Sequence, residues 1–471
     1  MDKPEHHKTA AADRLPFGQK VGFGIGAIVS IIGVTAVANL TMLFLNIGLK
    51  LNPVWVGVVM MLPRVWDAVT DPLVGHLSDN TRSRWGRRIP YVFVSAVLVG
   101  IMYAALWMTP QTWAPIPTFA YFLVMSLAFY TAMTLYGIPH QALGLEMTDD
   151  YHERTRLFAY ASFFGNVAAL TPPAFYWMAN RSCFENEVTG LKWVGSGVGL
   201  CLMLCGLFCA VACKERATGQ VKKQRKVTLR DSFAATCRNR NFLHLLAMVV
   251  LVIVGFAMVG GFANYILIYF IYGGDKDAAS FLMMINGWVW ALTGILGVFP
   301  MAWLSARMGK RKTLILFLLM MATGNLIKIW CYNPAVPYLT ILPTFMLSFG
   351  MVVLFSMFPS LLADVCNEDE LISGVRREGM YSASYGWWSK LGGSLAALIA
   401  GVLLNVSKFD ANLEVQTDSA LYWIRFYEIG IPSLLCFVAV GLMVFYPLTE
   451  ARAYEVKMKL EKLRSENEPN D

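Results

Sequence analysis

Three charged residues interrupt an apolar stretch in the first quarter of the chain. The stretch RVWDAVTDPLVGHLSDNTRSRWGRRIP covers residues 64–90, and its first two-thirds are apolar enough to lie in lipid, yet they contain Arg64, Asp67 and Asp71. A charge at bilayer depth costs about 2.5 to 3.5 kcal/mol on insertion scales. A protein that keeps three such charges together needs ion pairs or a bound ion to offset this cost.

The spacing of the two aspartates predicts a cation site. Asp67 and Asp71 are four residues apart, so they project from one face of a helix. Two ionised carboxylates that lie close together in a low dielectric repel each other, so one holds a proton or both share a cation. Sodium, like calcium and magnesium, is a hard cation that takes several oxygen ligands. We therefore expect Asp67, Asp71 and the hydroxyl of Thr70 to bind the cation.

Two other interpretations of these charges stay open at this point. Asp71 could cap a helix break before Pro72. Alternatively, Arg64 and Asp67 could form a static ion pair. Either arrangement would offset the insertion cost without any transported ion.

Lys390 is the second exceptional charge. It lies in the middle of the apolar run GWWSKLGGSLAALIAGVLLN, too deep to reach the membrane surface easily. A buried lysine usually pairs with a carboxylate, and we expect Asp67 or Asp71 to be that partner. Arrival of the cation would then release Lys390, which couples cation binding to a conformational change.

Long apolar blocks must position these charges. The chain has 471 residues, of which 56% are hydrophobic and 15% are charged, whereas soluble domains carry about 25% charged residues. Many blocks reach the roughly 20 residues that a spanning helix needs. Twelve such blocks are separated by turns or charge clusters, with approximate centres at 34, 64, 98, 130, 167, 203, 257, 291, 322, 350, 391 and 434. The sequence predicts an all-α membrane protein with twelve transmembrane helices in two six-helix halves.

A long polar interruption marks the boundary between the halves. We expect a cytoplasmic N-terminal segment over residues 1–20, six-helix bundles over 21–213 and 242–447, a basic linker over 214–241 and a cytoplasmic tail over 448–471. The loops after even-numbered helices hold clusters such as RSRWGRR and RMGKRK, whereas the odd-numbered loops hold few basic residues. The positive-inside rule then places both termini in the cytoplasm of a multi-pass plasma (inner) membrane protein.

Several motifs together resemble one family. They are RVWDAVTDPLVGHLSDNTRSRWGRRIPY, IPHQALGLEMTDDYHERTRLF, LLADVCNEDELISGVRREGMYSA and the following WWSKLGG. These segments are similar to the glycoside–pentoside–hexuronide:cation symporters, the melibiose-permease-like branch of the major facilitator superfamily. The resemblance covers about residues 15–447. It implies cation coupling, with the family's helix 2 acids at Asp67 and Asp71, its neighbouring polar position at Thr70, and its coupling lysine and arginine at Lys390 and Arg64.

The substrate positions depart from the melibiose permeases. The helix 1 aspartate is replaced at Ser30 and Ile31, the helix 4 aspartate by Gly137, the helix 5 arginine by Ser162 and a helix 4 aromatic by Gln141. The resemblance therefore argues against a galactoside. It leaves other glycosides, uronides and sulfosugars open.

Polar and aromatic residues near a proline in helix 4 are candidates for substrate binding. Sugars are held by polar side chains and by aromatic rings that stack on their apolar faces. The candidates are Tyr136, His140, Gln141, Asn166, Trp387 and Trp388. Helix packing is the alternative for each of them, and His140 could instead carry a proton because its pKa lies near neutral.

Charged residues at the cytoplasmic helix ends resemble the gating loops of the superfamily. In the first half they are Asp79, Arg84, Arg87 and Arg88, and in the second half they are Asp364, Arg376, Arg377 and Glu378. We expect these residues to latch one conformational state. Solvated charges that only set the topology are the alternative.

These observations predict a secondary active transporter rather than an enzyme. We expect cation-coupled symport of a sugar or glycoside-type solute by alternating access, with sodium as the favoured monovalent cation. The alternatives are proton coupling, or an uncoupled facilitator or sensor of another solute, including a sulfosugar, a uronide or an amphiphile. Besides the lipid bilayer, the expected partners are the small-molecule substrate and the cation. We expect a monomer, with no nucleic acid partner, no cofactor and no metal other than the transported cation.

Overall fold

The computed structural model describes residues 14–148, 150–215, 239–374, 377–413, 415–448 and 450–467, and within these ranges every regular element is helical. The chain divides into two compact units, Met1–Lys223 and Gln224–Asp471. The dividing point falls inside the segment that the sequence marks as the linker. Each unit is built from six successive membrane passages, counted over the described residues.

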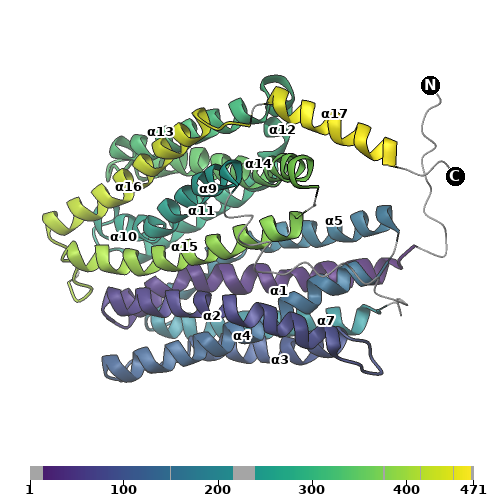
Figure 1. Cartoon of the computed structure of the whole chain (residues 1–471). Coiled ribbons are helices and arrows are strands. Elements are labelled where there is room, and N and C mark those ends of the chain that lie inside the picture. The colour runs from purple at the N-terminus through teal and green to yellow at the C-terminus, as the bar shows by residue number, and fades with distance from the viewer. Residues whose placement is uncertain are drawn as a thin grey trace. The chain divides into compact units, whose positions relative to one another are not determined.

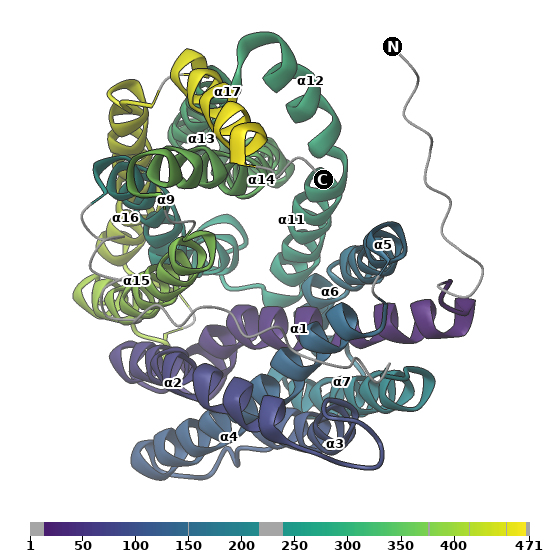
Figure 2. The same cartoon turned by 45° about the vertical axis from the view of Figure 1, so that its right-hand side comes forward.

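Unit 1 contains seven α-helices within its described residues. They are α1 (Phe17–Met42), which continues into the π-helical segment η2 (Leu43–Gly48), α2 (Pro53–Asn80), α3 (Ile89–Leu106), α4 (Pro115–Glu146), α5 (Tyr151–Ala168), α6 (Pro172–Ala179) and α7 (Glu187–Ala212). The long helices α1 to α4 run alongside one another (Figure 1). Helix α3 packs against both α4 and α7, and α1 packs against α5 and α7 (Figure 2).

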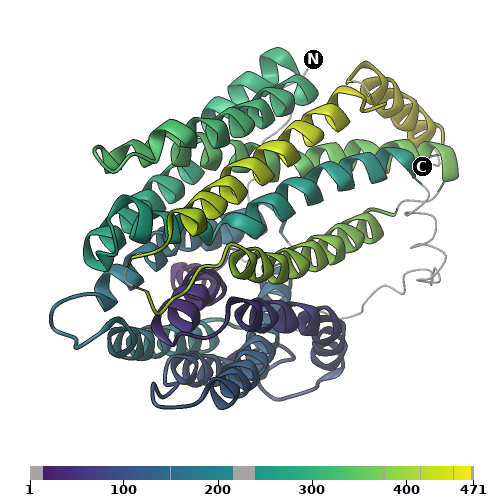
Figure 3. The ribbon, with the colours of Figure 1, turned by 90° about the vertical axis from the view of Figure 1, so that its left-hand side faces the viewer.

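Unit 2 follows the same plan. Its helices are α9 (Arg240–Val259), α10 (Phe262–Tyr265), the π-helical η3 (Ile266–Ile271), α11 (Lys276–Leu296), α12 (Val298–Met308), α13 (Lys310–Cys331), the short 3₁₀ turn η4 (Pro337–Thr340), α14 (Ile341–Ser373), α15 (Glu378–Val406), α16 (Asp418–Val444) and α17 (Glu450–Asn467). Helix α9 packs against α15 and α16, and α13 packs against α14 and α16. Figure 3 shows teal α9 and yellow α16 side by side.

The first passage of each unit ends in the same kind of hydrogen-bonded turn, which follows a π-helical segment. After η2, the N–H of Leu51 donates to the carbonyl of Leu45 at 2.8 Å, and after η3 the N–H of Gly274 donates to Ile268 at 2.8 Å. The residue just before each donor, Lys50 in unit 1 and Gly273 in unit 2, adopts a left-handed backbone conformation, with φ of 57° and 59°. The two units therefore share the backbone geometry at the end of their first passage as well as the pattern of helix packing, although the side chains there differ.

Ten helices in the described ranges are long and apolar enough to cross a membrane. The two remaining passages are α2, which carries the charges described above, and α5 with α6, where the chain is interrupted between Ala168 and Pro172. Proline lacks the backbone N–H and clashes with the preceding turn, so the adjacent prolines at 172 and 173 stop α5 and start α6. The sequence predicted a helix centred near residue 167 in this passage, and the structure divides the passage into α5 and α6.

Close backbone contact fixes α3 against α7. A Cβ atom added at Gly100 would lie 2.6 Å from the carbonyl oxygen of Gly199. A Cβ atom added at Gly199 would likewise lie 2.6 Å from the carbonyl oxygen of Gly100. Helix association in lipid depends on such small residues, because apolar burial supplies little driving force between helices. This pair therefore sets the distance between two of the central helices of unit 1.

Candidate functional site

Helix α2 carries the two aspartates and continues past them. Its start is capped by Asn52, whose side chain accepts a hydrogen bond from the N–H of Val54 at 2.9 Å, with Pro53 at the first helical position. The helix then runs through Pro72 to Asn80 without a break. Asp71 therefore does not cap a helix break, and that alternative from the sequence is wrong.

A hydroxyl of α4 approaches both carboxylates. The Oγ1 of Thr134 lies 3.4 Å from Oδ1 of Asp67 and 3.3 Å from Oδ1 of Asp71. Thr134 is buried and both aspartates are half-buried. A hydroxyl has a single proton, so it donates to one carboxylate at a time and keeps its lone pairs for another partner. Three oxygen-bearing side chains from two helices thus converge on one point.

Thr70 lies between the two aspartates but is oriented differently. Its side chain is buried, and its hydroxyl is 3.2 Å from the carbonyl of Trp66 and 3.5 Å from that of Asp67. The hydroxyl thus bonds back to its own helix. Its participation in a cation site stays a prediction, whereas Thr134, which the sequence reasoning did not select, meets both carboxylates.

A second contact between the two helices positions this cluster. The indole Nε1 of Trp66 donates to Oγ1 of Thr131 at 2.9 Å, and Thr131 in turn donates to the carbonyl of Leu127 at 2.7 Å. Trp66 precedes Asp67, and Thr131 lies one helical turn before Thr134. The contact therefore holds α2 and α4 in register at the level of the carboxylates. The signal in the sequence was the spacing of Thr131 and Thr134, which places both hydroxyls on one face of α4.

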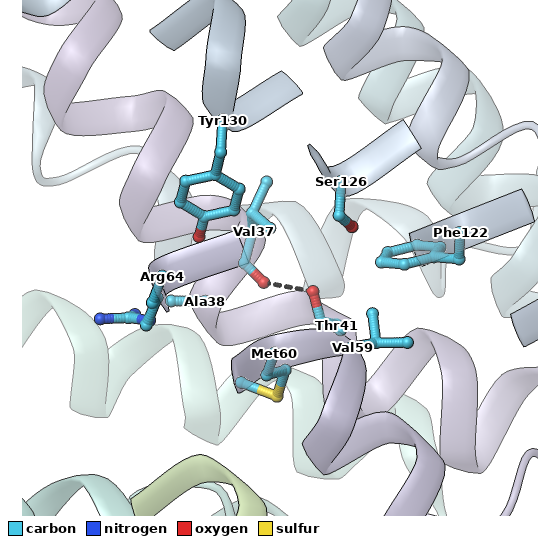
Figure 4. A pocket seen from close by; sticks show the side chains of 9 residues that line it. All are labelled: Val37, Ala38, Thr41, Val59, Met60, Arg64, Phe122, Ser126 and Tyr130. Carbon is cyan, nitrogen blue, oxygen red and sulfur yellow. Dashed lines mark hydrogen bonds between the residues drawn. The ribbon is translucent and has the colours of Figure 1, made fainter. Parts of the chain in front are cut away.

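Arg64 lines a pocket beside this cluster. The pocket lies between α1, α2 and α4, and its volume of about 10 Å³ has room for little more than one water molecule (Figure 4). Its lining residues are Val37, Ala38, Thr41, Val59, Met60, Arg64, Phe122, Ser126 and Tyr130. In the part of the chain that the structure describes, Arg64 forms no ion pair. The static Arg64–Asp67 pair that the sequence left open is therefore not present.

The proposed sugar contacts of helix 4 lie in different environments. Tyr136 is completely buried, and its hydroxyl donates to the carbonyl of Gly26 at 3.0 Å. His140 is also buried, with Nε2 3.1 Å from the carbonyl of Phe23 and its ring stacked on that phenyl ring. Helix packing accounts for both residues in this arrangement. Gln141, one residue further, is exposed.

The other expected contacts are accessible. Asn166 on α5 is exposed, and Trp387 and Trp388 on α15 are 42% and 40% exposed. Lys390 is half-buried on the same helix. Asn166 belongs to unit 1 and the other three residues to unit 2, so their meeting at one substrate stays a prediction, as does the pairing of Lys390 with Asp67 or Asp71.

Three of the four gating residues predicted in unit 1, Asp79, Arg87 and Arg88, belong to one network. Arg88 donates to Ser78 at 2.7 Å and to Glu146 of α4 at 3.0 Å, and it also bonds Asp79. Burial would lower the pKa of Arg88, but the carboxylates of Glu146 and Asp79 raise it above its ordinary value. Arg87 also pairs with Glu146, at 3.1 Å.

Two further residues complete the description of this loop. Glu215, just after α7, accepts hydrogen bonds from the backbone N–H groups of Arg87, Arg88 and Ile89 at 2.6, 2.5 and 2.9 Å. Arg84 lies over the indole ring of Trp85, 5.2 Å from its centroid. Neither Glu146 nor Glu215 was among the gating residues predicted from the sequence.

The gating residues of unit 2 make separate ion pairs. Lys310 lies 2.7 Å from Asp364, and Arg377 lies 3.3 Å from Asp369. Glu378 is the first residue of α15. Arg376 lies outside the described residues. The latch that the sequence predicts from Asp364, Arg376, Arg377 and Glu378 therefore stays a prediction.

Comparisons with known proteins agree with this architecture. A family model described as MFS/sugar transport protein matches residues 22–450. The sodium-dependent lysophosphatidylcholine symporter 1-A of Danio rerio is 23% identical, over 100% of this chain and 92% of that protein. The glucuronide carrier protein homolog of Escherichia coli (strain K12) is 24% identical, over 86% of this chain and 87% of that protein.

A solved structure shows the same fold. It is a bacterial homolog of the human lysosomal transporter Spinster, in an inward-facing and occupied conformation. It superposes with a TM-score of 0.66 at 13% identity, and the match covers 93% of this chain and 97% of that one. At this identity the likeness concerns the fold alone.

Proposed function

We propose that this chain, which belongs to the MFS/sugar transport family of the glycoside–pentoside–hexuronide:cation symporter type, couples sodium entry to the transport of a sugar or glycoside-type solute. Its relatives are membrane transporters and not enzymes. The observation that carries the proposal is the convergence of Thr134, Asp67 and Asp71, with oxygen separations of 3.3 and 3.4 Å. Oxygen ligands of this kind suit a hard cation.

The cation has a defined electrostatic role in this proposal. Two carboxylates on one helical face repel each other when both are ionised, and a shared sodium ion removes that repulsion. Thr134 brings α4 into the same site, so cation binding would draw α2 and α4 together. The Danio rerio relative is a sodium-dependent symporter, which supports sodium over a proton.

The substrate part of the proposal is a sugar bearing a ring and several hydroxyl groups. The glucuronide carrier homolog supports a sugar-type solute. Exposed Trp387 and Trp388 offer ring faces, and exposed Gln141 and Asn166 offer amide groups that bind hydroxyls. In this proposal the two units rock about a central site, both termini are cytoplasmic, and the chain resides in the plasma membrane of its cell.

A sodium-dependent thermal shift tests the cation. Purified protein is unfolded in detergent in sodium chloride and in choline chloride at equal ionic strength, because a ligand of the native state stabilises it by mass action. The variants are Asp67→Asn, Asp71→Asn and Thr134→Val. The control is Thr323→Val, whose exposed hydroxyl bonds only the carbonyls of its own helix, at 2.9 and 3.0 Å.

The expected result is a sodium-specific rise in the unfolding midpoint of the wild type. The rise should vanish in both aspartate variants, shrink in Thr134→Val and persist in Thr323→Val. A wild type that ignores sodium, or a rise that survives in both aspartate variants, overturns the sodium site. Proteoliposome flux of glycoside, uronide and sulfosugar probes under a sodium or a pH gradient then separates sodium coupling from proton coupling and from uncoupled transport.

A further inference from the structure

Helix α12 of unit 2 lies between the second and third passages and presents a stripe of large exposed side chains. Phe299, Trp303 and Arg307 are four residues apart, so they share one face of the helix. Phe299 is 73% exposed, Trp303 is 55% exposed and Arg307 is also exposed. Met301, on the opposite face, is buried in the core of unit 2. In Figure 2, α12 follows α11 along an edge of this unit.

The length of α11 indicates where this stripe lies relative to a bilayer. Helix α11 has 21 residues. At the helical rise of about 1.5 Å per residue it is about 31 Å long, and the hydrocarbon core of a bilayer is about 30 Å thick. Helix α12 begins just after Gly297, where α11 has ended. In the orientation proposed above, α12 therefore lies at the cytoplasmic boundary of the bilayer.

The order of the side chains along the stripe matches the change from hydrocarbon to water. Phe299 comes first, Trp303 lies about 6 Å further along the helix axis, and Arg307 lies about 6 Å beyond that. Tryptophan is enriched at the membrane interface. The guanidinium of Arg307 lies 4.1 Å from the centroid of the Trp303 ring. A guanidinium that lies over a ring keeps its in-plane N–H groups for another partner.

The charges around α12 leave an excess of positive charge. Helices α12 and α13 contain no aspartate or glutamate. Lys310 pairs with Asp364 of α14 at 2.7 Å, and Arg311 donates to a backbone carbonyl of α16 at 3.0 Å. Arg307 and Lys312 are exposed and form no ion pair with any residue that the structure describes. This surface therefore attracts anions.

We propose that this face of α12 binds the phosphate group of an anionic phospholipid in the cytoplasmic leaflet. Arg307 donates its in-plane N–H groups to a phosphate oxygen, and Lys312 adds positive charge nearby. The indole N–H of Trp303 donates at the level of the ester carbonyls, and Phe299 contacts the acyl chains. The lipid is neither the solute nor the cation of the proposed function, and its binding needs neither of them.

Unit 1 repeats the pairing of a guanidinium with an indole after its second passage, but in other surroundings. The guanidinium of Arg84 lies 5.2 Å from the ring centroid of Trp85, which is 57% exposed. Three carboxylates, of Asp79, Glu146 and Glu215, bond the same loop. Carboxylates oppose the approach of an anionic headgroup, so the proposal concerns α12, and Arg84 supplies a matched comparison.

Native mass spectrometry of the purified full chain tests the lipid. The protein in detergent is titrated with dioleoyl phosphatidylglycerol, which has a net negative charge, and with dioleoyl phosphatidylcholine, which has a phosphate but no net charge. Inorganic phosphate is added as a competitor, because it separates a lipid site from a site for the free ion. The variants are Arg307→Gln, Arg307→Lys and Trp303→Leu, and the control is Arg84→Gln.

The wild type should bind phosphatidylglycerol more tightly than phosphatidylcholine. Arg307→Gln should weaken phosphatidylglycerol by about 5-fold, the factor that corresponds to one basic residue near an anionic surface. Arg307→Lys should retain part of the preference, because it keeps the charge without the planar fork. Trp303→Leu should weaken both lipids, because the indole contacts a part that they share. Arg84→Gln should leave the preference unchanged.

Equal affinity of the wild type for the two lipids overturns the proposal, as does a preference that survives in Arg307→Gln. The assignment to α12 also falls if Arg84→Gln weakens phosphatidylglycerol as much as Arg307→Gln does. Displacement of the lipid by inorganic phosphate overturns it too, because the recognised group is then a free ion. Thermal unfolding midpoints of the variants identify any variant that has not folded.

Fluorescence quenching in proteoliposomes locates the lipid in a bilayer. Phosphatidylglycerol with brominated acyl chains, in a background of phosphatidylcholine, should quench the wild type more than brominated phosphatidylcholine at the same fraction. Trp303→Phe should remove this excess, because the quenched indole is then absent. An excess that persists in Trp303→Phe places the lipid elsewhere and overturns the proposal. Both measurements omit sodium and solute, so their outcome is independent of the proposed transport function.

Discussion

The carboxylate of Glu215 occupies the space that a side chain at Gly86 would need. Gly86 has φ of 102°, a conformation that favours glycine. The same carboxylate receives three consecutive backbone N–H groups, from Arg87 to Ile89. The end of α7 and the loop before α3 are therefore built around one half-buried carboxylate, and the loop that carries Arg88 depends on a residue far away in the sequence.

We expect Glu215→Ala to lower the stability of unit 1 and to loosen this loop. The change leaves three N–H groups at the start of α3 without their acceptor. An unsatisfied buried group costs about 1 to 3 kcal/mol, and since water reaches these half-buried groups in part, we expect a total loss within that range. Thermal unfolding in detergent measures the loss. The control is Glu185→Ala, which removes an exposed carboxylate. An equal effect of the two substitutions contradicts the assignment.

A second prediction concerns a buried ion pair in unit 2. Lys328 of α13 lies 2.5 Å from Glu428 of α16, and the two side chains are 9% and 2% exposed. Removing one partner of such a pair costs about 3 to 5 kcal/mol, because the other charge stays buried and unpaired. Lys328→Met and Glu428→Leu should therefore each strongly reduce the unfolding midpoint. The double variant should recover most of the loss, and a double variant as unstable as the sum of both would contradict this account.

The glycine contact between α3 and α7 yields a packing prediction. Gly100→Val places methyl groups against the carbonyl of Gly199, where even a single added carbon would lie 2.6 Å away. We expect a loss of about 1 to 3 kcal/mol, the usual range for overpacking. Gly197→Val is the matched control on α7, since no atom lies within 4 Å of a side chain added there. Similar unfolding midpoints for both variants would show that the helices separate readily.

The orientation in the membrane is tested by the exposed Cys183, between α6 and α7. In a variant that keeps Cys183 as its single cysteine, a membrane-impermeant maleimide should label intact cells, because this loop is predicted to be external. A cysteine introduced at the predicted cytoplasmic Lys214 should be labelled only after permeabilisation. The reverse pattern would invert the topology.

The helices could be predicted from the sequence because their signal is repeated along many residues. The lengths of the apolar blocks and the placement of basic loops indicate twelve passages in two halves, and the described structure has this order of elements. The interruption at Pro172 was missed because a block of hydrophobic residues continues across it. Hydropathy averages over about a helix length, so it does not register a break of a few residues.

The site could be predicted only in part, for a related reason. Asp67 and Asp71 are conspicuous because a carboxylate is rare in an apolar helix. Thr134 carries no such signal, since threonine hydroxyls in membrane helices usually bond their own backbone. His140 shows the opposite case. A polar ring near a proline suggested a ligand contact, and in the structure its Nε2 lies 3.1 Å from the carbonyl of Phe23, so the ligand contact stays a prediction. Which neighbour a polar atom meets depends on how two helices pack.

The first passage of each unit ends in a π-helical segment, η2 or η3, and there the passage can lose a residue without disturbing the helix before it. A π-helical turn corresponds to an α-helical turn with one residue inserted, and such turns occur singly within α-helices. Deleting one residue from Leu43–Gly48 or Ile266–Ile271 would return the last turns of that passage to α-helical geometry and leave the helix before them in register. The same deletion in the middle of α1 would rotate all the residues on one side by about 100°, which would turn packed faces toward lipid. Each half thus has one built-in position that can absorb a shift in register.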